Sequence, residues 1–482
     1  MFNQFAWELY KNSEQGKAVI REFSELVNDT RQWDTMKRYN PNFCKTQYQE
    51  DFDAILWTIY TTIEDYIEVP TSLREAKTAF EACIDYGVRD DDYYFVREKE
   101  YDFMIGCVVH YSFILYFIAG DFFFPYLFSY NIFPLVKLAD YFGIKLPQVP
   151  KKTDYRGRCM YYWELCEIFY DFRMEYGLST TELCAFLYDF SPKIIGRIKD
   201  EKMPTSSQVW CIGGAMNDFE QSQDMQMWQC NKETKRGDII LHYETSPISA
   251  ITTIWRASTN GIIDPYFYYY SEIYIDNKLS VPPITLKEMR MDDYFKNHPL
   301  VRKNFQGVNG FSFSSQDYTE LKKIWMQKGF DISLLPTLYA PDIALASNIN
   351  KERDVEIVLL EPLLNEMGVE WVRQLPIHAG RGHRIYPDYA LYADTTAGYE
   401  KAEILIEAKF LMKNNKDVEE CFMQARSYAN ILEASIIIIC DKNCLIIYRK
   451  HESFDRNRFM KIYWSELRQP DVYNKLKQII TK

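Results

Sequence analysis

The sequence predicts a multidomain α+β protein with three successive regions, each marked by a different spacing of its apolar residues. Residues 1–200 repeat apolar side chains at intervals of three and four, which is typical of helices, whereas residues 207–330 contain short β-branched and aromatic runs typical of strands. Residues 345–482 mix both patterns. A chain of 482 residues exceeds the usual size of one folded unit, and 47% hydrophobic residues can give each region its own core.

The N-terminal region, residues 1–200, is predicted to be all α-helical, and no motif in it indicates a role. Helices are expected through residues 55–63 and 162–172, where the apolar residues share one helical face. Residues 178–183 and 190–195 each offer a Ser or Thr that can cap a short helix. Two capped helices in succession also fit a DNA-binding helix-turn-helix, which stays open as an alternative.

Residues 103–136 are the one stretch apolar enough to suggest a membrane segment. Asp121 is their only formally charged residue. Gly120 and Pro125 interrupt the stretch, so each part is shorter than the ~20 apolar residues that a spanning helix needs. A buried pair of helices is therefore predicted, no membrane partner is expected, and a membrane hairpin is the alternative.

The net charge and the cysteine content limit the classes of protein to which this chain can belong. The formal net charge of −12 arises mostly before residue 341, and nucleic-acid binding requires only a local basic face, so net charge decides nothing about it. The 11 Cys form no CxxC pair and the 6 His are dispersed, which indicates a reducing, cytoplasmic compartment and no zinc site. The first residues lack the basic and then apolar start of a signal peptide, so export is not expected.

The central region, residues 207–330, is predicted to be a compact, mostly β domain. Its strands are expected at residues 209–212, 238–243, 250–255 and 266–270, separated by Gly, Pro, Asn and Ser. A helix near residues 318–325 ends the domain. A linker that contains Pro336 and Pro341 then leads to the third region.

Four segments of this region, residues 237–243, 251–257, 264–266 and 301–307, resemble an EVE domain of the PUA-like superfamily. The resemblance implies a small β-barrel, related to the YTH readers of methylated RNA, that holds a flipped-out modified base. A methylated base adds apolar surface, on which an aromatic ring can stack while an amide or hydroxyl contacts the base edge. The candidate pocket residues are Trp210, Trp228, Tyr243 and Trp255. A core position is the alternative for each ring.

The third region, residues 345–482, is predicted to run helix, strand, strand, helix, strand. Its first helix is expected over residues 352–367 and ends at Gly368. The chain then turns into residues 370–374, and strands are expected at residues 387–391 and 403–409. The expected inner side of the helix comprises Val355, Ile357, Val358, Leu359, Leu363 and Leu364.

Two of these strands carry a group of charged residues. Asp388 and Glu407 are separated by 18 residues, enough for one strand to end, turn and return beside itself. Glu407 and Lys409 are two apart, so their side chains share one face of the strand while Ala408 faces the core. Asp388, Glu407 and the carbonyl of Ala408 would supply oxygen ligands to Mg²⁺, and Lys409 would orient a water or neutralise charge on a phosphate.

Pro387-Asp388, Glu407-Ala408-Lys409 and residues 424–428 resemble the PD-(D/E)xK nucleases. The likeness covers about 100 residues and is to the restriction-type branch, which includes the nuclease domain of type I restriction motor subunits. It implies that Gln424 and Tyr428 form the QxxxY element, which contacts DNA or braces the site. It also implies that Glu352 is the helix acid that assists the metal, with Glu356, one turn on, as the alternative.

Together the two resemblances imply a Mg²⁺-dependent deoxyribonuclease, with Mn²⁺ as a substitute, that cleaves DNA carrying modified bases in antiviral defence. Because a double-strand break needs two active sites or two sequential nicks, a homodimer is an expected partner arrangement. Two alternatives remain open. One is a nuclease that acts in DNA repair or on RNA, and the other is a binding or sensing protein whose nuclease fold does not cleave.

Overall fold

The computed structural model describes residues 2–26, 32–63, 69–86, 97–196, 202–215, 226–267, 270–341, 349–378 and 384–481. Its secondary structure is mixed α and β, as the sequence predicts. The chain divides into two compact units. Unit 1 comprises residues 1–203, 225–233 and 259–274, and unit 2 comprises residues 204–224, 234–258 and 275–482. Two short segments of the central region thus pack with the N-terminal helices.

All the regular secondary structure described in the N-terminal part of unit 1 is helical, as predicted, with longer non-helical stretches at residues 120–132 and 143–154. Its elements are α1 (Gln4–Asn12), α2 (Glu14–Glu25), α3 (Gln32–Tyr39), α4 (Pro41–Thr46), α5 (Gln49–Ile63), α6 (Leu73–Tyr86), α7 (Arg97–Gly106), α8 (Val108–Ala119), α9 (Phe133–Phe142), α10 (Tyr155–Tyr176), α11 (Thr180–Ala185), η2 (Phe186–Phe190) and α12 (Ser191–Gly196).

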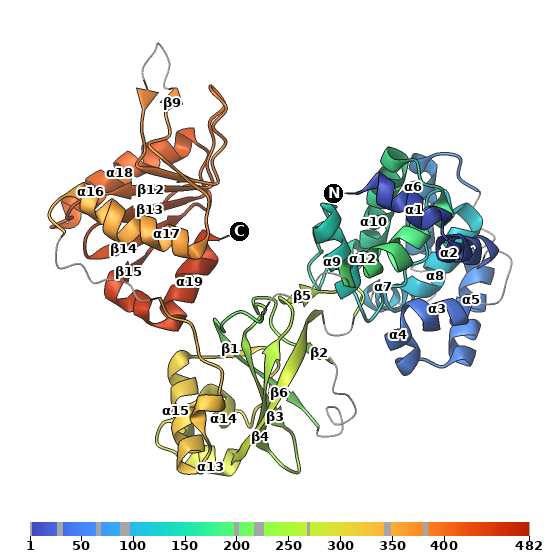
Figure 1. Cartoon of the computed structure of the whole chain (residues 1–482), viewed down its shortest axis with the longest axis horizontal. Helices are drawn as coiled ribbons and strands as arrows, with labels where there is room; N and C mark the ends of the chain where they lie inside the picture. Colours follow the sequence, from blue (N-terminus) through green and yellow to red (C-terminus); the bar gives the residue numbers. More distant parts are fainter. Residues whose placement is uncertain are drawn as a thin grey trace. The chain divides into compact units, whose positions relative to one another are not determined.

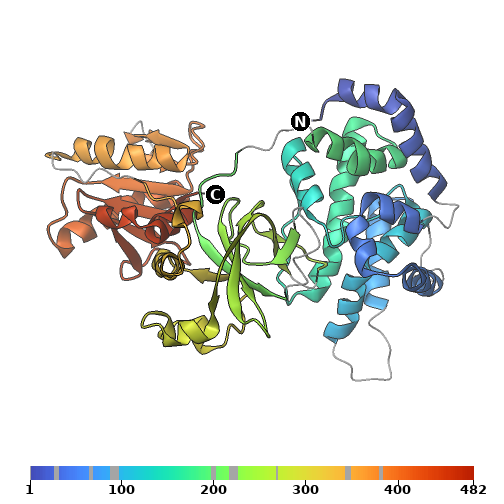
Figure 2. The same ribbon diagram turned by 60° about the horizontal axis from the view of Figure 1, so that its bottom comes forward.

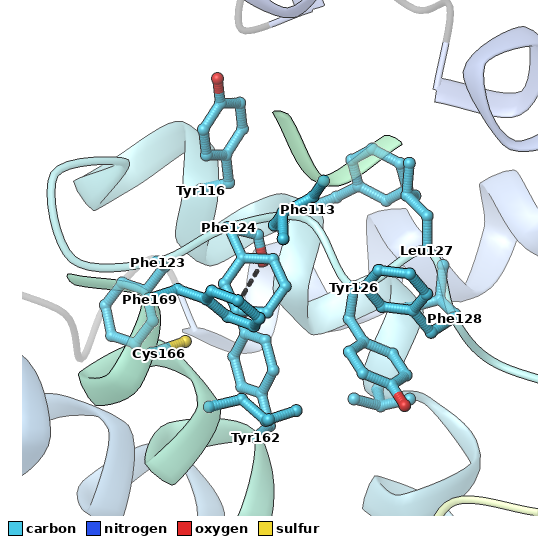
Figure 3. Packing of buried hydrophobic residues seen from close by; sticks show 14 of the residues in the cluster. Phe113, Tyr116, Phe123, Phe124, Tyr126, Leu127, Phe128, Tyr162, Cys166 and Phe169 are labelled. Atoms are coloured by element: carbon cyan, nitrogen blue, oxygen red, sulfur yellow. Dashed lines mark hydrogen bonds between the residues drawn. The ribbon is translucent and has the colours of Figure 1, made fainter. Parts of the chain in front are cut away.

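Aromatic side chains fill the core of this helical part. Tyr162 of α10 is fully buried, and its hydroxyl donates a 2.7 Å hydrogen bond to the carbonyl oxygen of Phe124 (Figure 3). The rings of Phe124 and Phe169 meet edge to face, with centroids 5.2 Å apart. Aromatic rings bury a large apolar area, and a tyrosine hydroxyl still finds a polar partner there. The aromatic richness of the sequence is therefore explained in this region by packing.

The apolar stretch 103–136 lies in this core. Helix α8 is buried on nearly all sides, but residues 123–128 continue as buried, non-helical chain, and the next helix, α9, begins only at Phe133. The predicted pair of buried helices is thus correct for α8 and wrong for the segment that follows it, because Pro125 lacks the amide hydrogen that a helix interior requires. Among the described helices, none combines the length and the apolar character that crossing a bilayer requires.

The alternative of a helix-turn-helix at residues 178–195 is wrong. Ser179 and Glu182 form the expected capping box at the start of α11. However, α11, the π-helical η2 and α12 follow one another without a turn, because Ser191 continues the helix instead of capping a second one. A single bent helix cannot place a separate recognition helix in a DNA groove.

The central region forms a seven-stranded sheet in the order β2-β6-β4-β3-β1-β7, with β5 paired to β6. Strands β1 and β3 are parallel, and β1–β7, β3–β4 and β4–β6 are antiparallel. The elements are β1 (Val209–Gly214), β2 (Gln226–Gln229), β3 (Ile239–Glu244), β4 (Ala250–Ala257), β5 (Ile262–Ile263), β6 (Ser271–Thr285), α13 (Leu286–Met291), η4 (Phe295–Asn297), α14 (Pro299–Arg302), β7 (Phe311–Phe313), α15 (Ser315–Gln327) and η5 (Ile332–Leu334).

Three of the four strands predicted here are confirmed as β1, β3 and β4, and the predicted closing helix is confirmed as α15. The fourth, at residues 266–270, is wrong. Tyr266 lies in a turn, the long strand β6 begins only at Ser271, and residues 268 and 269 lie outside the described residues. The backbone amide of Tyr266 instead donates to the side chain of Asp264, a local hydrogen bond that favours a turn over a strand.

The C-terminal part of unit 2 is built on a six-stranded sheet in the order β15-β14-β13-β12-β11-β8, beside a small β9–β10 hairpin. Only the β12–β13 pair is parallel. The elements are α16 (Glu352–Asp354), η6 (Val355–Leu360), α17 (Glu361–Met367), β8 (Trp371–Arg373), β9 (Ile377–His378), β10 (Arg384–Ile385), β11 (Tyr389–Leu391), β12 (Ile404–Ala408), α18 (Asn415–Ile431), β13 (Ile436–Cys440), β14 (Cys444–Arg449), β15 (Phe459–Tyr463), η7 (Trp464–Arg468) and α19 (Pro470–Ile480).

Helices cover both faces of this sheet, and Figures 1 and 2 show the layers from two directions. Apolar residues of η6, α17 and α19 pack on one face with Ile406 and Ala408 of β12. Those of α18 pack on the other face with Leu405. The predicted first helix, the strands β11 and β12, the helix α18 and the strand β13 occur in the expected order, but β8, β9 and β10 precede β11, and β14, β15 and α19 follow β13. The alternation along β12 sends Glu407 toward the layer of α18.

The inner side of the first helix differs from the prediction. Ile357 and Val358 are exposed, whereas Glu356 and Leu360 are buried. At about 100° per residue, the helical face that carries Val355, Leu359 and Leu363 also includes Glu356 and leaves out Ile357 and Val358, so the predicted inner side was too wide.

Candidate metal centre

Asp388 and the pair Glu407 and Lys409 come together at one end of two neighbouring strands. Asp388 directly precedes β11, Glu407 lies in β12, and the two strands pair antiparallel with Tyr389 opposite Ile406. The backbone amide of Ala408 donates to Asp388 Oδ2 across 2.8 Å. Sequence spacing thus predicted the meeting of these residues correctly.

Three carboxylates form an acidic cluster at this point. One oxygen each of Glu352, Glu356 and Asp388 lies within 4.8 Å of the other two. Glu352 and Asp388 are half-buried and Glu356 is buried. The cluster therefore contains both candidate helix acids, and it differs from the predicted ligand set of Asp388, Glu407 and the Ala408 carbonyl because Glu407 is not one of the three.

Glu407 lies beside the cluster, where two neighbouring side chains contact one oxygen of its carboxylate. Lys409 Nζ is 3.0 Å from its Oε1, and Gln424 Nε2 of α18 donates to the same oxygen across 2.5 Å. Gln424 also approaches the hydroxyl of Tyr428 at 3.4 Å. The other oxygen, Oε2, is buried and has no hydrogen-bond partner in the structure. Of the two roles implied for Gln424, this geometry corresponds to bracing the site.

Burial and mutual repulsion raise the pKa of the carboxyl groups at the centre. Burial, and then the charge of Asp388, raise the pKa of Glu407 to about 7 despite the opposing charge of Lys409. Burial also raises the pKa of Glu352 and of Asp388. Burial by itself would lower the pKa of Lys409, but the negative charge of Glu407 raises it, so the ammonium remains charged. Crowded, partly dehydrated carboxylates of this kind are stabilised by a positive ion.

The predictions missed a group of side chains that surround Glu356. Its Oε2 accepts hydrogen bonds from Arg373 Nε at 3.0 Å, from the Tyr389 hydroxyl at 3.1 Å and from Arg353 Nη1. The Tyr389 hydroxyl and Arg353 also contact Glu361, at 2.7 and 3.2 Å. Arg353 lies in the predicted first helix and Arg373 in β8, and the packing of these two elements brings both to Glu356.

The residues present fit a divalent, oxygen-seeking cation. All the charged donors at the centre are carboxylates, which Mg²⁺ and Mn²⁺ prefer, and no cysteine or histidine belongs to the cluster among the described residues. The unpartnered, buried Glu407 Oε2 is a further oxygen without a proton donor. Such an atom costs free energy unless a proton, a water or an ion satisfies it.

The four aromatic residues predicted to form a base pocket are mostly covered by protein. The indole nitrogen of Trp210 donates to Asp238 Oδ2 at 2.9 Å, and the indole nitrogen of Trp255 donates to the Thr253 hydroxyl at 3.1 Å. Tyr243 stacks on Phe305, with ring centroids 3.8 Å apart and planes within 5°. Trp210, Tyr243 and Trp255 are buried, and Trp228 of β2 is half-buried. Trp228 is thus the most accessible of the four.

Comparison with known proteins identifies no relative from which a role can be taken. No family model matches the chain, and no curated protein matches it. The NMR structure of Rpa0253 from Rhodopseudomonas palustris aligns with 25% of this chain and 94% of its own length, at 12% sequence identity and a TM-score of 0.22. A likeness of this size carries no argument about fold or function.

Proposed function

We propose that the C-terminal part of the chain is a metal-dependent deoxyribonuclease of the PD-(D/E)xK type. The observation that carries the proposal is the cluster of Glu352, Glu356 and Asp388 beside the ion pair of Lys409 and Glu407. Hydrolysis of a phosphodiester needs a bound cation and a nearby positive side chain, and this centre offers a place for both.

Asp388 and Glu352 would hold the ion, with Glu407 close by. When bound, Mg²⁺ would polarise the phosphate and lower the pKa of a water. Lys409, kept charged by Glu407, can then neutralise the charge that develops on the phosphate oxygens. Gln424 fixes Glu407 from the adjacent helix, so that the carboxylate and the ammonium keep their positions.

The test uses the full chain with supercoiled and linear DNA in Mg²⁺, in Mn²⁺ and in EDTA. Cleavage in either metal, loss of cleavage in EDTA, and loss in Asp388→Asn, Glu407→Gln and Lys409→Met are the expected results. Glu452→Gln, a change at an exposed carboxylate in the same part of the chain, serves as the matched control. Undiminished cleavage by the Asp388 and Lys409 variants would overturn the proposal.

The resemblance of the central region to an EVE domain supports a second step of the proposal, in which the nuclease acts on DNA with modified bases, as in restriction of foreign DNA. Duplexes of one sequence, unmodified or carrying methylated, hydroxymethylated or glucosylated cytosine, would test it. Faster cleavage of one modified form is expected. Equal rates on all duplexes would remove the modification dependence, and preferred cleavage of RNA or of damaged DNA would favour the alternative of RNA processing or repair.

A further inference from the structure

Two acidic residues of the same helical segment reach the centre, and either could complete the site. Glu352 and Glu356 are one turn apart, and each has an oxygen within 4.8 Å of one from Asp388. Proximity by itself does not separate their roles. Their hydrogen-bond partners do.

Three protein donors hold one of the two oxygens of the Glu356 carboxylate. Arg373 Nε at 3.0 Å, the Tyr389 hydroxyl at 3.1 Å and Arg353 Nη1 all reach the same atom, Oε2. Two of the three donors are guanidinium groups, which form strong, directional bonds with carboxylates. A cation could reach only the other oxygen without displacing these donors, and there it would share the carboxylate with two guanidinium groups that already neutralise its charge.

Glu352 presents the opposite picture. It is half-buried, and its carboxylate makes no hydrogen bond or ion pair with any residue that the structure describes. Among charged groups, Lys409 lowers the pKa of Glu352, and the carboxylates of Asp388 and Glu356 raise it. A carboxylate with free lone pairs that faces other carboxylates is the better ligand.

The bonds around Glu356 also join three elements of the fold. Glu356 and Arg353 belong to the helical segment, Arg373 to β8 and Tyr389 to β11. Arg373 and Tyr389 are directly opposite in the β8–β11 register, and Tyr389 is the residue after Asp388. The Tyr389 hydroxyl further bridges Glu356 to Glu361 of α17. The position of Asp388 is therefore tied to the helix through Tyr389 and Glu356.

We infer that Glu356 is a positioning residue, which Arg353, Arg373 and Tyr389 hold away from the cation, and that it fixes Asp388 against the helix that presents Glu352. The inference rests on the proposed nuclease function and assigns parts within the same centre. Partners that orient a ligand in this way commonly change metal affinity or activity 10- to 100-fold when they are lost.

The experiment measures Mn²⁺ binding by calorimetry and the kcat and KM for DNA cleavage on the full chain. Glu352→Gln and Asp388→Asn are expected to weaken Mn²⁺ binding at least about 10-fold. Glu356→Gln is expected to weaken Mn²⁺ binding less than Asp388→Asn does, because Asp388 shifts but remains a ligand, and to lower kcat about 10- to 100-fold at little changed KM. Glu370→Gln, at an exposed carboxylate beyond the helix, is the matched control and should behave as wild type.

Tyr389→Phe distinguishes a positioning role of Glu356 from a ligand role, because it removes a hydrogen bond to Glu356 without changing the charge of the centre. If Glu356 positions Asp388, this variant shows the same fall in kcat, and the double variant with Glu356→Gln is no worse than either single one. If Glu356 ligates the ion, Tyr389→Phe frees the Glu356 carboxylate and Mn²⁺ binds as well as before or more tightly, with cleavage retained.

That result, or loss of Mn²⁺ binding in Glu356→Gln equal to that in Asp388→Asn, would overturn the inference and leave the nuclease assignment intact. A wild-type protein that neither binds Mn²⁺ nor cleaves DNA would overturn both.

Discussion

The side-chain amide of Gln424 donates to Glu407 Oε1 across 2.5 Å, which ties helix α18 to strand β12 at the acidic centre. Replacing Gln424 by Leu keeps similar bulk but removes the donor, and we expect kcat for DNA cleavage to fall about 10- to 100-fold. Gln424→Glu should be more damaging, because it brings a second negative charge to Glu407. Steady-state cleavage assays would measure both, with Met423→Leu on the exposed side of the same helix as the control. Unchanged kcat in Gln424→Leu would show that Glu407 needs no brace.

Neutralising Asp388 is expected to abolish cleavage while making the metal-free protein more heat-stable. Asp388→Asn removes repulsion among partly buried carboxylates, and relief of about 1 kcal/mol would raise the melting temperature by about 2–4 °C for a folded part of 150–250 residues. Added Mn²⁺ should stabilise the wild type and have little effect on the variant. Calorimetry with and without Mn²⁺ would show this. A lower melting temperature for Asp388→Asn in the absence of metal would mean that the carboxylate supports the fold.

Two carboxyl groups in unit 1 predict a dependence of stability on pH. Asp264 and Glu272 are fully buried, and Asp264 Oδ2 and both oxygens of Glu272 lack hydrogen-bond partners in the structure. Burial raises the pKa of both, and the charge of Asp264 raises that of Glu272 further. The folded state thus holds protons that the unfolded state releases above about pH 4, so stability is complete below that pH and is lost as pH rises through the raised pKa values.

Hydrogen–deuterium exchange at a series of pH values, corrected for the intrinsic exchange rate, would report this on peptides from α10 and from residues 259–274. Faster opening at higher pH is expected in the wild type. Glu272→Gln should flatten the dependence, whereas Asp171→Asn, at an exposed carboxylate of α10, should keep it. Protection that is constant from pH 5 to pH 9 in the wild type would contradict the prediction.

If the chain recognises a modified base, its affinity for modified duplexes should differ from its affinity for unmodified ones when cleavage is prevented. Because residues 225–233 and 259–274 pack with the helices, the full chain carrying Asp388→Asn is the proper material, not an isolated central fragment. One methyl group in an aromatic pocket is worth ~1–3 kcal/mol, so modified duplexes should bind about 10- to 200-fold more tightly. Trp228→Ala should erase the preference and leave the salt-dependent, nonspecific affinity almost unchanged. Fluorescence anisotropy at fixed salt would measure both, and equal affinity for all duplexes would contradict modified-base recognition.

Sequence by itself determined the elements whose causes are local. Periodicity located α5 and α10 within residues 1–200, the strands β1, β3 and β4, and the strands β11 and β12 beside which Asp388 and Glu407 meet. The spacing of Glu407 and Lys409 also determined that their side chains share a face of the strand, where the structure shows an ion pair between them. Prediction from apolar periodicity failed where a single residue had the stronger effect. At Tyr266 the side chain of Asp264 stabilises a turn, and after α8 the chain that contains Pro125 is not helical.

Only the tertiary structure decided which acids meet. The periodicity of apolar residues does not show which acidic residues pack against the sheet, yet Glu356 is buried there against Arg373 and Tyr389. Arg353, Arg373 and Tyr389 lie up to 36 positions apart in the sequence and converge because β8, β11 and the helix pack together. Burial, which no single segment specifies, then raises the pKa of Glu352, Asp388 and Glu407. The sequence supplied the charges of this centre, and packing set their distances and their solvation, on which the strength of every electrostatic interaction depends.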